Sequence, residues 1–186
     1  MTTLVFFLEE PSAKAMLEGV LSRLLPDHIV IRYMVFEGKQ DLHKQLSRKL
    51  RLWQGDDALF VVMRDQDAGD CHLIKQQLLA LCQEAGKSAL VRIACRELES
   101  FYLGDLAAVE QGLGLKGLAK QQNSRKFRDP DQLVNAAEEL FKVTGRQYQK
   151  VSGSRAIAPH LALDDSNRSS SFRALITGIQ RICAYS

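Results

Sequence analysis

Short apolar segments alternate with amphipathic segments through the first half of the chain. The apolar runs, rich in β-branched and aromatic residues, cover residues 4–8, 29–36, 58–63 and 89–94. Apolar positions at helical spacing follow each of the first three runs. This βαβ alternation predicts an open parallel sheet wound with helices, which is an α/β fold.

Local signals mark the helices between these predicted strands. Pro11 opens the first helix, apolar residues keep helical spacing from Asp41 in the second, and Asp70 stands where the N-cap of the third belongs. Gly86 ends that third helix. The run at 58–63 has little polar alternation, which favours a strand that is buried on both faces of the sheet.

The pattern changes after residue 94. A short helical stretch at about 98–103 leads through a glycine-rich run into the polar segment 120–128, and further helices are predicted at about 130–143 and 170–183. We therefore expect an α/β core over residues 1–115 and a helical extension over residues 116–186 that packs on it.

The composition agrees with a soluble globular protein and excludes intrinsic disorder. Hydrophobic residues make up 46% and charged residues 25% of the 186 positions. No apolar run approaches the roughly 18 residues of a membrane span, and no signal peptide is recognisable at the N-terminus. The four cysteines lack metal-binding spacing, which favours reduced thiols and a cytoplasmic location.

The net charge of +3 conceals an uneven distribution. The predicted core holds 13 basic and 16 acidic residues, whereas the predicted extension holds 12 basic and 6 acidic residues. The basic extension favours contact with a polyanion such as DNA or RNA. We therefore expect a nucleic-acid interface there, formed by Arg125, Lys126, Arg128, Lys150, Arg155, Arg168, Ser169 and Arg173. The alternative is a solvated basic face with Ser169 as a simple helix cap.

Acidic residues lie where predicted strands end. Glu9 follows the first strand, and Asp65 and Asp67 follow the third. In an extended segment, residues i and i+2 project to one side, and parallel strands end along one edge of their sheet. We therefore expect the three carboxylates to converge. The alternative is that they are ordinary turn residues.

Converging carboxylates repel each other unless a cation neutralises them. An all-oxygen ligand set suits Mg²⁺ or Mn²⁺, which would leave positions open for a phosphodiester. Glu99 and Asp105 follow the fourth strand and are candidates for additional metal ligands. Alternatively, Glu97 and Glu99 lie on the exposed face of a first helical turn, where acids favour the helix dipole.

Two of these segments resemble the motifs of Toprim domains. The glutamate that ends the first strand in Val5–Lys14 resembles the first Toprim motif, and Asp65-Gln66-Asp67 resembles the Asp-x-Asp motif. The resemblance implies that Glu9 is a general acid/base or metal ligand and that Asp65 and Asp67 bind Mg²⁺. Glu10 departs from the pattern, because a glycine is usual there.

The likeness extends over nearly the whole chain to a bacterial Toprim-like family related to nucleases of the overcoming-lysogeny-defect (OLD) type. The stretches that carry it are 36–42, 64–70, 96–105 and 169–173. It implies a Toprim-like, Rossmann-like open parallel sheet with a C-terminal helical extension. It also implies a Mg²⁺-dependent (or Mn²⁺-dependent) nuclease or related phosphodiester-processing enzyme, with a possible role in phage defence beside an ATPase partner.

Two other functions remain open at this stage. Glu10 in place of glycine favours a catalytically silent nucleic-acid-binding or regulatory partner of an ATPase. A metal-dependent phosphatase or nucleotide hydrolase that acts on a small phosphate ester is the third possibility.

Overall fold

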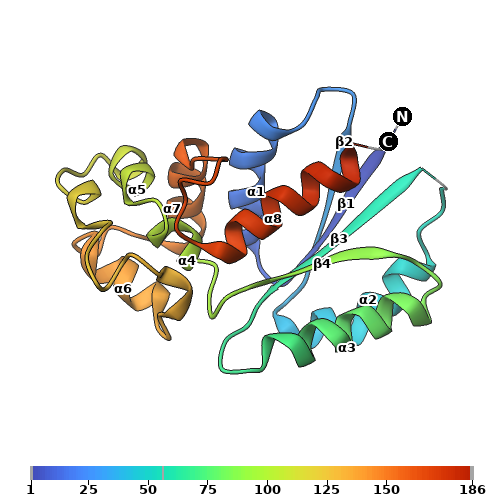
Figure 1. Ribbon diagram of the computed structural model, residues 1–186. Coiled ribbons are helices and arrows are strands. Elements are labelled where there is room, and N and C mark those ends of the chain that lie inside the picture. Colours follow the sequence, from blue (N-terminus) through green and yellow to red (C-terminus); the bar gives the residue numbers. More distant parts are fainter. Residues whose placement is uncertain (1, 56, 185–186) are drawn as a thin grey trace.

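A four-stranded parallel sheet forms the centre of the molecule (Figure 1). The computed structural model describes residues 2–55 and 57–184. The strands are β1 (Thr3–Leu8), β2 (Val30–Val35), β3 (Ala58–Asp65) and β4 (Ala89–Ala94), and they lie in the order β2-β1-β3-β4. The α/β fold expected from the sequence is therefore confirmed, with all four strands within two residues of their predicted bounds.

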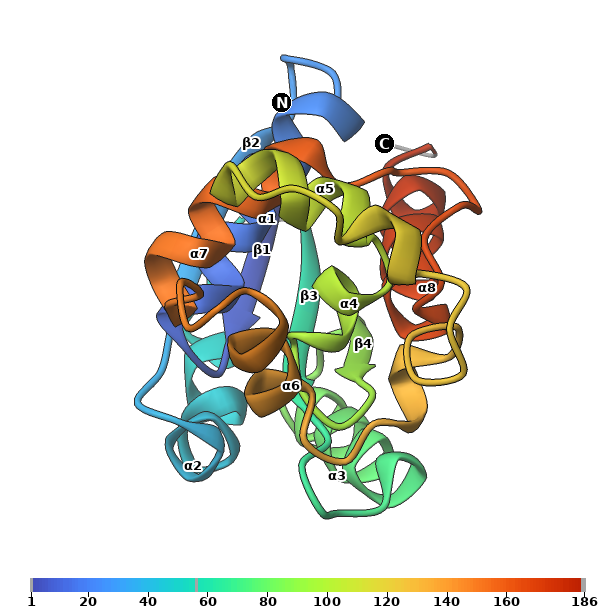
Figure 2. The same ribbon diagram turned by 90° about the vertical axis from the view of Figure 1, so that its left-hand side faces the viewer.

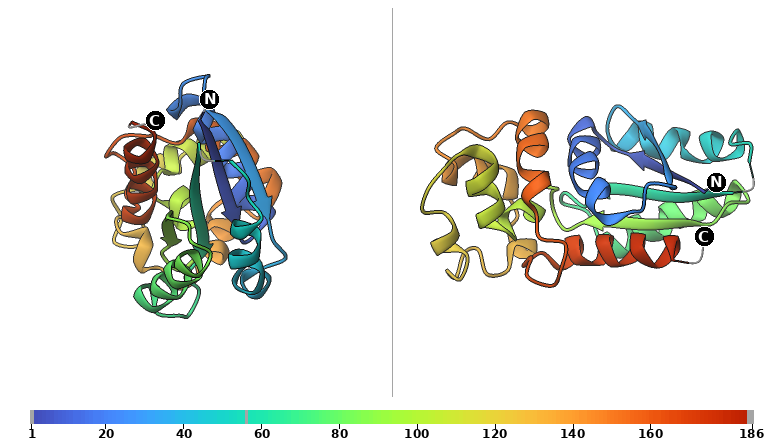
Figure 3. Two further views of the ribbon diagram at one scale, coloured as in Figure 1. Left: turned by 90° about the vertical axis from the view of Figure 1, so that its right-hand side faces the viewer. Right: turned by 90° about the horizontal axis from the view of Figure 1, so that it is seen from above.

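Helices cover both faces of this sheet. On one face lie α1 (Pro11–Leu24) and α8 (Ser170–Cys183), and on the other lie α2 (Lys39–Arg51) and α3 (Cys71–Glu84) (Figure 3). Alternation along β1 explains the two layers, because Phe6 packs into the core beneath α1 whereas Phe7 packs beneath α2 and α3. All residues from Leu4 to Leu8 are fully buried, as expected for a strand covered on both sides.

A group of short helices gathers at the carboxyl ends of the strands (Figure 2). It comprises α4 (Ser100–Leu103), α5 (Leu106–Leu113), α6 (Ala136–Val143) and α7 (Lys150–Ile157), with the 3₁₀ turns η1 (Ala119–Gln121), η2 (Pro130–Gln132) and η3 (Ala158–His160). The guanidinium of Arg23 on α1 donates to the carbonyls of Ala158 and Leu161, at 2.8 and 2.9 Å. These bonds and the packing of α1 against α7 hold the helical group on the sheet.

The second half of the chain departs from the predicted elements in two places. The helix expected at 130–143 is divided into η2 and α6, because Leu133 adopts an extended backbone. Helix α7 lacks a clear sequence signal, since it contains Gly153 and two serines within eight residues. A single hydrophobic core runs from β1 through the helical group to α8, so packing is continuous across the expected boundary at residue 115.

In the described ranges, no helix combines the length and the apolar character that crossing a membrane would require.

The closest approach of α5 to α7 gives a test of this packing. A Cβ atom on Gly112 would lie 2.5 Å from the carbonyl oxygen of Ala156 and 2.7 Å from Cα of Ile157. Both are backbone atoms, so the helices would have to separate. We expect Gly112→Ala to lower the free energy of unfolding by about 2 kcal/mol or more, although alanine is the better helix former. Urea denaturation measures the change.

The control is Gly178→Ala on α8, where the nearest atoms belong to the side chain of Arg92. That side chain can move, so the loss should be smaller. Equal stability of Gly112→Ala and the wild type would contradict the packing described for α5 and α7.

Candidate active site

Three acidic side chains from different elements meet at the carboxyl edge of the sheet. Glu9 follows β1, Asp65 ends β3, and Glu99 precedes α4 after β4. The parallel register pairs Leu8 with Met63, so Glu9 lies beside the last residues of β3. The backbone N–H of Asp65 donates to Oε2 of Glu9 at 2.9 Å. We call Glu9, Asp65 and Glu99, together with Glu10, the carboxylate cluster.

Burial and mutual repulsion raise the proton affinity of this cluster. Burial raises the pKa of Asp65 well above its usual range, and the charges of Glu99, Glu10 and Glu9 add to the effect. Burial also raises the pKa of Glu9, against the opposing effects of the Asp65 N–H and of Arg64. The cluster is therefore short of positive charge.

Glu99 is the most enclosed member of the cluster. Its side chain has no exposed surface, and burial raises its pKa. The hydroxyl of Tyr148 donates to Oε1 at 2.9 Å, but Oε2 is buried without a hydrogen-bond partner. A buried carboxylate oxygen without a partner is costly, and a proton or a metal ion at this position would remove the cost.

Lys150, the first residue of α7, brings a positive charge to the cluster. Its Nζ lies 3.3 Å from Oε2 of Glu10. Burial lowers the pKa of Lys150, but the charges of Glu10, Glu99 and Asp65 outweigh burial and raise it. The ammonium group therefore stays protonated and partly neutralises the cluster. The glutamate that departs from the Toprim pattern is the direct partner of this lysine.

The side chains of Asp65 and Asp67 do not project to one side, contrary to our expectation from their spacing. The extended backbone ends at Asp65, and Asp67 has a positive φ of 54°. The i, i+2 rule applies only to extended segments, so it does not govern the direction of the Asp67 side chain. Oδ2 of Asp67 lies 2.6 Å from Nζ of Lys39 and 3.8 Å from the guanidinium of Arg64. Asp67 is nevertheless near enough to raise the pKa of Glu9.

Asp105 and Glu97 serve as backbone caps. One oxygen of Asp105 accepts from the N–H of Ala108 and the other from the N–H of Ala162, at 3.1 and 2.8 Å. Glu97 accepts from the N–H of Ala137 at 2.7 Å. Asp105 thus has a structural role, and its expected role as a metal ligand stays a prediction. Glu97 has a role at the start of α6.

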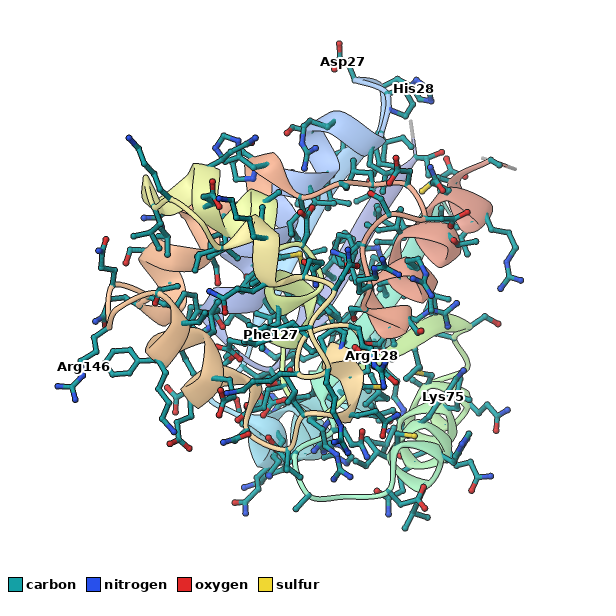
Figure 4. The ribbon with its side chains drawn as sticks, turned by 60° about the vertical axis from the view of Figure 1, so that its left-hand side comes forward. Asp27, His28, Lys75, Phe127, Arg128 and Arg146 are labelled. Carbon is teal, nitrogen blue, oxygen red and sulfur yellow. The ribbon has the colours of Figure 1, made fainter. Side chains whose placement is uncertain are left out.

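The basic residues of the expected nucleic-acid interface fall into three places. Arg128, Arg168 and Arg173 line a surface depression of about 420 Å³ at the start of α8, and Arg125 and Lys126 line a neighbouring one with Arg128. Arg128, which lines both, is labelled in Figure 4. Lys126 also pairs with Glu139. Arg155 is exposed on α7, and Lys150 lies at the carboxylate cluster.

At the start of α8, where the sequence suggested an anion, side chains of the protein already accept from the N–H groups of Ser171 and Phe172. Ser169 is buried; its hydroxyl donates to Asp131 at 2.6 Å and accepts from the N–H of Phe172. The other oxygen of Asp131 accepts from the N–H of Ser171 at 2.8 Å. A carboxylate of the chain itself therefore caps α8, and the alternative of a capping role for Ser169 is the one that the structure supports.

The donor set of the carboxylate cluster fits a hard divalent cation. Among the residues described, no three acidic, histidine or cysteine side chains form a ready metal centre. However, Glu9, Asp65 and Glu99 offer only oxygen atoms, carry raised pKa values and include the unpartnered Oε2 of Glu99. These are properties of carboxylates that a Mg²⁺ or Mn²⁺ ion would stabilise.

The cluster gives the protein a characteristic dependence of stability on pH. Because folding raises the pKa of Asp65, Glu9 and Glu99, the folded chain binds more protons than the unfolded chain. The cluster therefore costs little stability below about pH 4, and its cost grows as the pH rises through the folded-state pKa values. In EDTA, Asp65→Asn should be more stable than the wild type at pH 8, by about 1.4 kcal/mol for each tenfold difference in proton affinity.

Thermal unfolding at pH 4, 6 and 8 measures this effect, with Asp70→Asn as the control. Hydrogen bonds from the N–H groups of Leu73 and His72 lower the pKa of Asp70, so its replacement should bring no gain at pH 8. A wild-type protein that gains stability relative to Asp65→Asn between pH 4 and pH 8 would refute the description of the cluster.

Known proteins support the fold that carries this site. A solved structure described as the C-terminal region of the Burkholderia pseudomallei OLD protein superposes with a TM-score of 0.55 at 18% identity, covering 97% of this chain and 98% of the other. This similarity shows that the two chains share a fold, in agreement with the α/β fold expected from the sequence. No curated protein matches the chain. The family described as "Domain of unknown function (DUF4276)" matches residues 8–180, and the chain therefore belongs to that family.

Proposed function

We propose that the protein is a Mg²⁺- or Mn²⁺-dependent nuclease, or a related phosphodiester-processing enzyme, that acts on DNA or RNA. The observation that carries the proposal is the convergence of Glu9, Asp65 and Glu99 from three strand ends, with Lys150 beside them. The similarity to a region of the OLD protein supports the fold in which this convergence occurs. The expected location in the cytoplasm belongs to the same proposal.

The side chains of the cluster have distinct roles in this proposal. Glu9, Asp65 and Glu99 would hold the metal, which supplies Lewis-acid activation of the phosphoryl group and of a water molecule. Tyr148 orients Glu99 through its hydroxyl, and Lys150 balances the negative charge of Glu10. Glu9 would also act as general base, a role that its raised pKa supports, because this pKa lies nearer to neutral pH than that of an ordinary glutamate. Asp67 would join the ligands through Oδ1, or through Oδ2 once its ion pair with Lys39 opens.

Arginine side chains near the start of α8 are the proposed binding site for the nucleic-acid backbone. Arg128, Arg168 and Arg173 surround one depression, and guanidinium groups bind phosphate through paired hydrogen bonds. Arg173 already donates to the carbonyl of Asn167, and Arg168 to the side chain of Asn123. These bonds orient the two arginines before any ligand binds.

The contact between Glu10 and Lys150 favours one alternative function. An ammonium group beside the carboxylates supplies part of the charge that a metal ion would bring. A catalytically silent nucleic-acid-binding or regulatory partner of an ATPase is the function consistent with that arrangement. Titration calorimetry separates the two, because the alternative requires nucleic-acid binding with a steep salt dependence and no binding of divalent metal.

Either function is compatible with an ATPase partner and a role in phage defence. The similar structure is the C-terminal region of the OLD protein. We propose that an ATPase acts with this protein. Co-purification of the two proteins tests this part of the proposal.

Single replacements in the cluster test the enzymatic proposal. We expect Glu9→Gln, Asp65→Asn and Glu99→Gln each to lower metal-dependent cleavage of DNA or RNA by about 100-fold or more, since each removes a charge that stabilises the metal and the transition state. The control is Asp27→Asn, which changes an exposed carboxylate in the turn before β2 (Figure 4). Cleavage of labelled strands with Mg²⁺ and with Mn²⁺ is the measurement.

Asp67→Asn is the informative fourth variant. A loss as large as that of Asp65→Asn would assign Asp67 to the metal, as its resemblance to the Asp-x-Asp motif implies. A smaller loss would assign it to the ion pair with Lys39. Wild-type activity in all the variants of the cluster would exclude the proposed active site.

A further inference from the structure

Helix α2 carries a dense positive charge, although residues 1–115, to which it belongs, carry a net negative charge. Its 13 residues include five lysines and arginines and one aspartate, giving a formal charge of +4, which exceeds the +3 of the entire protein. Lys39, Lys44, Arg48, Lys49 and Arg51 are all exposed. The buried positions Leu42, Leu46 and Leu50 face the sheet, so the cations occupy the outer side of the helix.

The outer side of α2 forms a stripe of one sign of charge. Lys44, Arg48 and Arg51 follow each other at intervals of four and three residues, which places them along one line of the helix. Arg32 of the edge strand β2 pairs in register with Val5, whose side chain packs on the α2 side of the sheet. Arg32 is exposed and therefore extends the positive surface beyond the helix.

Ion pairs within the protein neutralise only part of this positive charge. Arg51 pairs with Glu84 at 2.6 Å and Lys39 with Asp67 at 2.6 Å. Among the residues described, no ion pair holds Lys44, Arg48 or Lys49. Asp41, the one acid on the helix, accepts hydrogen bonds from the N–H of Glu37 and from Gln45, and the charges of Lys44 and Lys49 also help to lower its pKa.

The helix dipole does not explain the stripe either. It favours Arg48, Lys49 and Arg51 in the last turn but not Lys44 in the middle of the helix, and it opposes Lys39 in the first turn. Like charges four residues apart, such as Lys44 and Arg48, destabilise a helix by roughly 0.2–0.5 kcal/mol per pair. An anionic ligand would offset this cost.

The start of helix α2 also lies next to the candidate active site. Lys39 at the start of α2 is bonded to Asp67, two residues beyond Asp65 of the carboxylate cluster. From there α2 extends for about 20 Å, along which one strand of a duplex carries about six phosphates. The ligand that such a surface fits is an extended polyanion that begins at the site.

We propose that the outer side of α2, together with Arg32, binds the sugar–phosphate backbone of the nucleic acid whose phosphodiester reaches the carboxylate cluster. This inference rests on the proposed function and adds a second contact surface, separate from the arginines at the start of α8. The two basic surfaces lie on opposite faces of the sheet, so the nucleic acid would pass across the acidic edge between them.

The test is the double variant Lys44→Gln/Arg48→Gln, because glutamine keeps the helix propensity and removes both charges. The matched control is Lys75→Gln/Lys116→Gln, which removes two exposed lysines elsewhere; Lys75 lies on the neighbouring helix α3 (Figure 4). The ligands are labelled single-stranded DNA, duplex DNA and RNA of about 20 nucleotides each. Their binding is measured in EDTA by fluorescence anisotropy between 50 and 300 mM salt.

We expect the α2 variant to bind about 20-fold or more weakly at about 0.1 M salt, and the slope of log K against log salt to fall by roughly 1.4–1.8. The control should retain the wild-type slope. The α2 variant should still hydrolyse a small phosphodiester, bis(p-nitrophenyl) phosphate, with Mn²⁺ at the wild-type rate, because the replaced residues lie outside the cluster.

The outcomes separate this inference from the proposed function. Wild-type affinity and slope in the α2 variant, in a protein that cleaves nucleic acid, would overturn the inference alone. The α2 variant could lose binding although the wild-type protein shows no metal-dependent hydrolysis of any phosphodiester. That result would support the proposed binding surface on α2 and overturn the enzymatic proposal. A wild-type protein that binds no nucleic acid, but binds an acidic protein through α2, would overturn both.

Discussion

The concentration of carboxylates at one edge of the sheet is the constraint on which the rest of the structure depends. Glu9 and Asp65 are fixed there by parallel strand register, and Glu99 is buried beneath the helical group. Like charges in a poorly solvated place raise the free energy of the folded state unless protons, hydrogen bonds or cations compensate. The chain supplies some compensation through the hydroxyl of Tyr148 and the ammonium of Lys150. The compensation is incomplete, as the unpartnered oxygen of Glu99 indicates.

The helical group at the carboxyl ends of the strands is also part of the candidate site. Its residues Tyr148 and Lys150 follow each other closely in sequence, yet both reach acids that come from the strand ends. A second buried bond, from the hydroxyl of Tyr102 to that of Ser154 at 2.6 Å, holds α7 against α4. The close packing of α7 on α1 then fixes the lysine relative to β1. Stability of this group and charge balance at the sheet edge are therefore coupled.

The sequence predicted the sheet well because each strand is a local signal. Buried apolar runs and caps such as Asp70 act over a few residues, and the helix at 170–183 was also predicted within a residue. The sequence did not predict the direction of the Asp67 side chain, because that direction depends on one backbone turn with a positive φ. The roles of Tyr148, Lys150 and Asp131 could not be read from the chain, since each acts on a partner about 40 residues or more away.

Charge placement matters more here than net charge. A phosphate backbone that approaches the carboxylate cluster is repelled by it, and screening reduces this repulsion only beyond about 8–10 Å at physiological salt. Binding therefore requires cations that touch the backbone within that distance on either side of the acids. Arg128, Arg168 and Arg173 lie around the start of α8, and the stripe on α2 lies on the opposite face of the sheet. Acids at the edge with cations on both flanks form an arrangement that would hold a polyanion by its neighbouring phosphates while one phosphodiester faces the cluster, as proposed above.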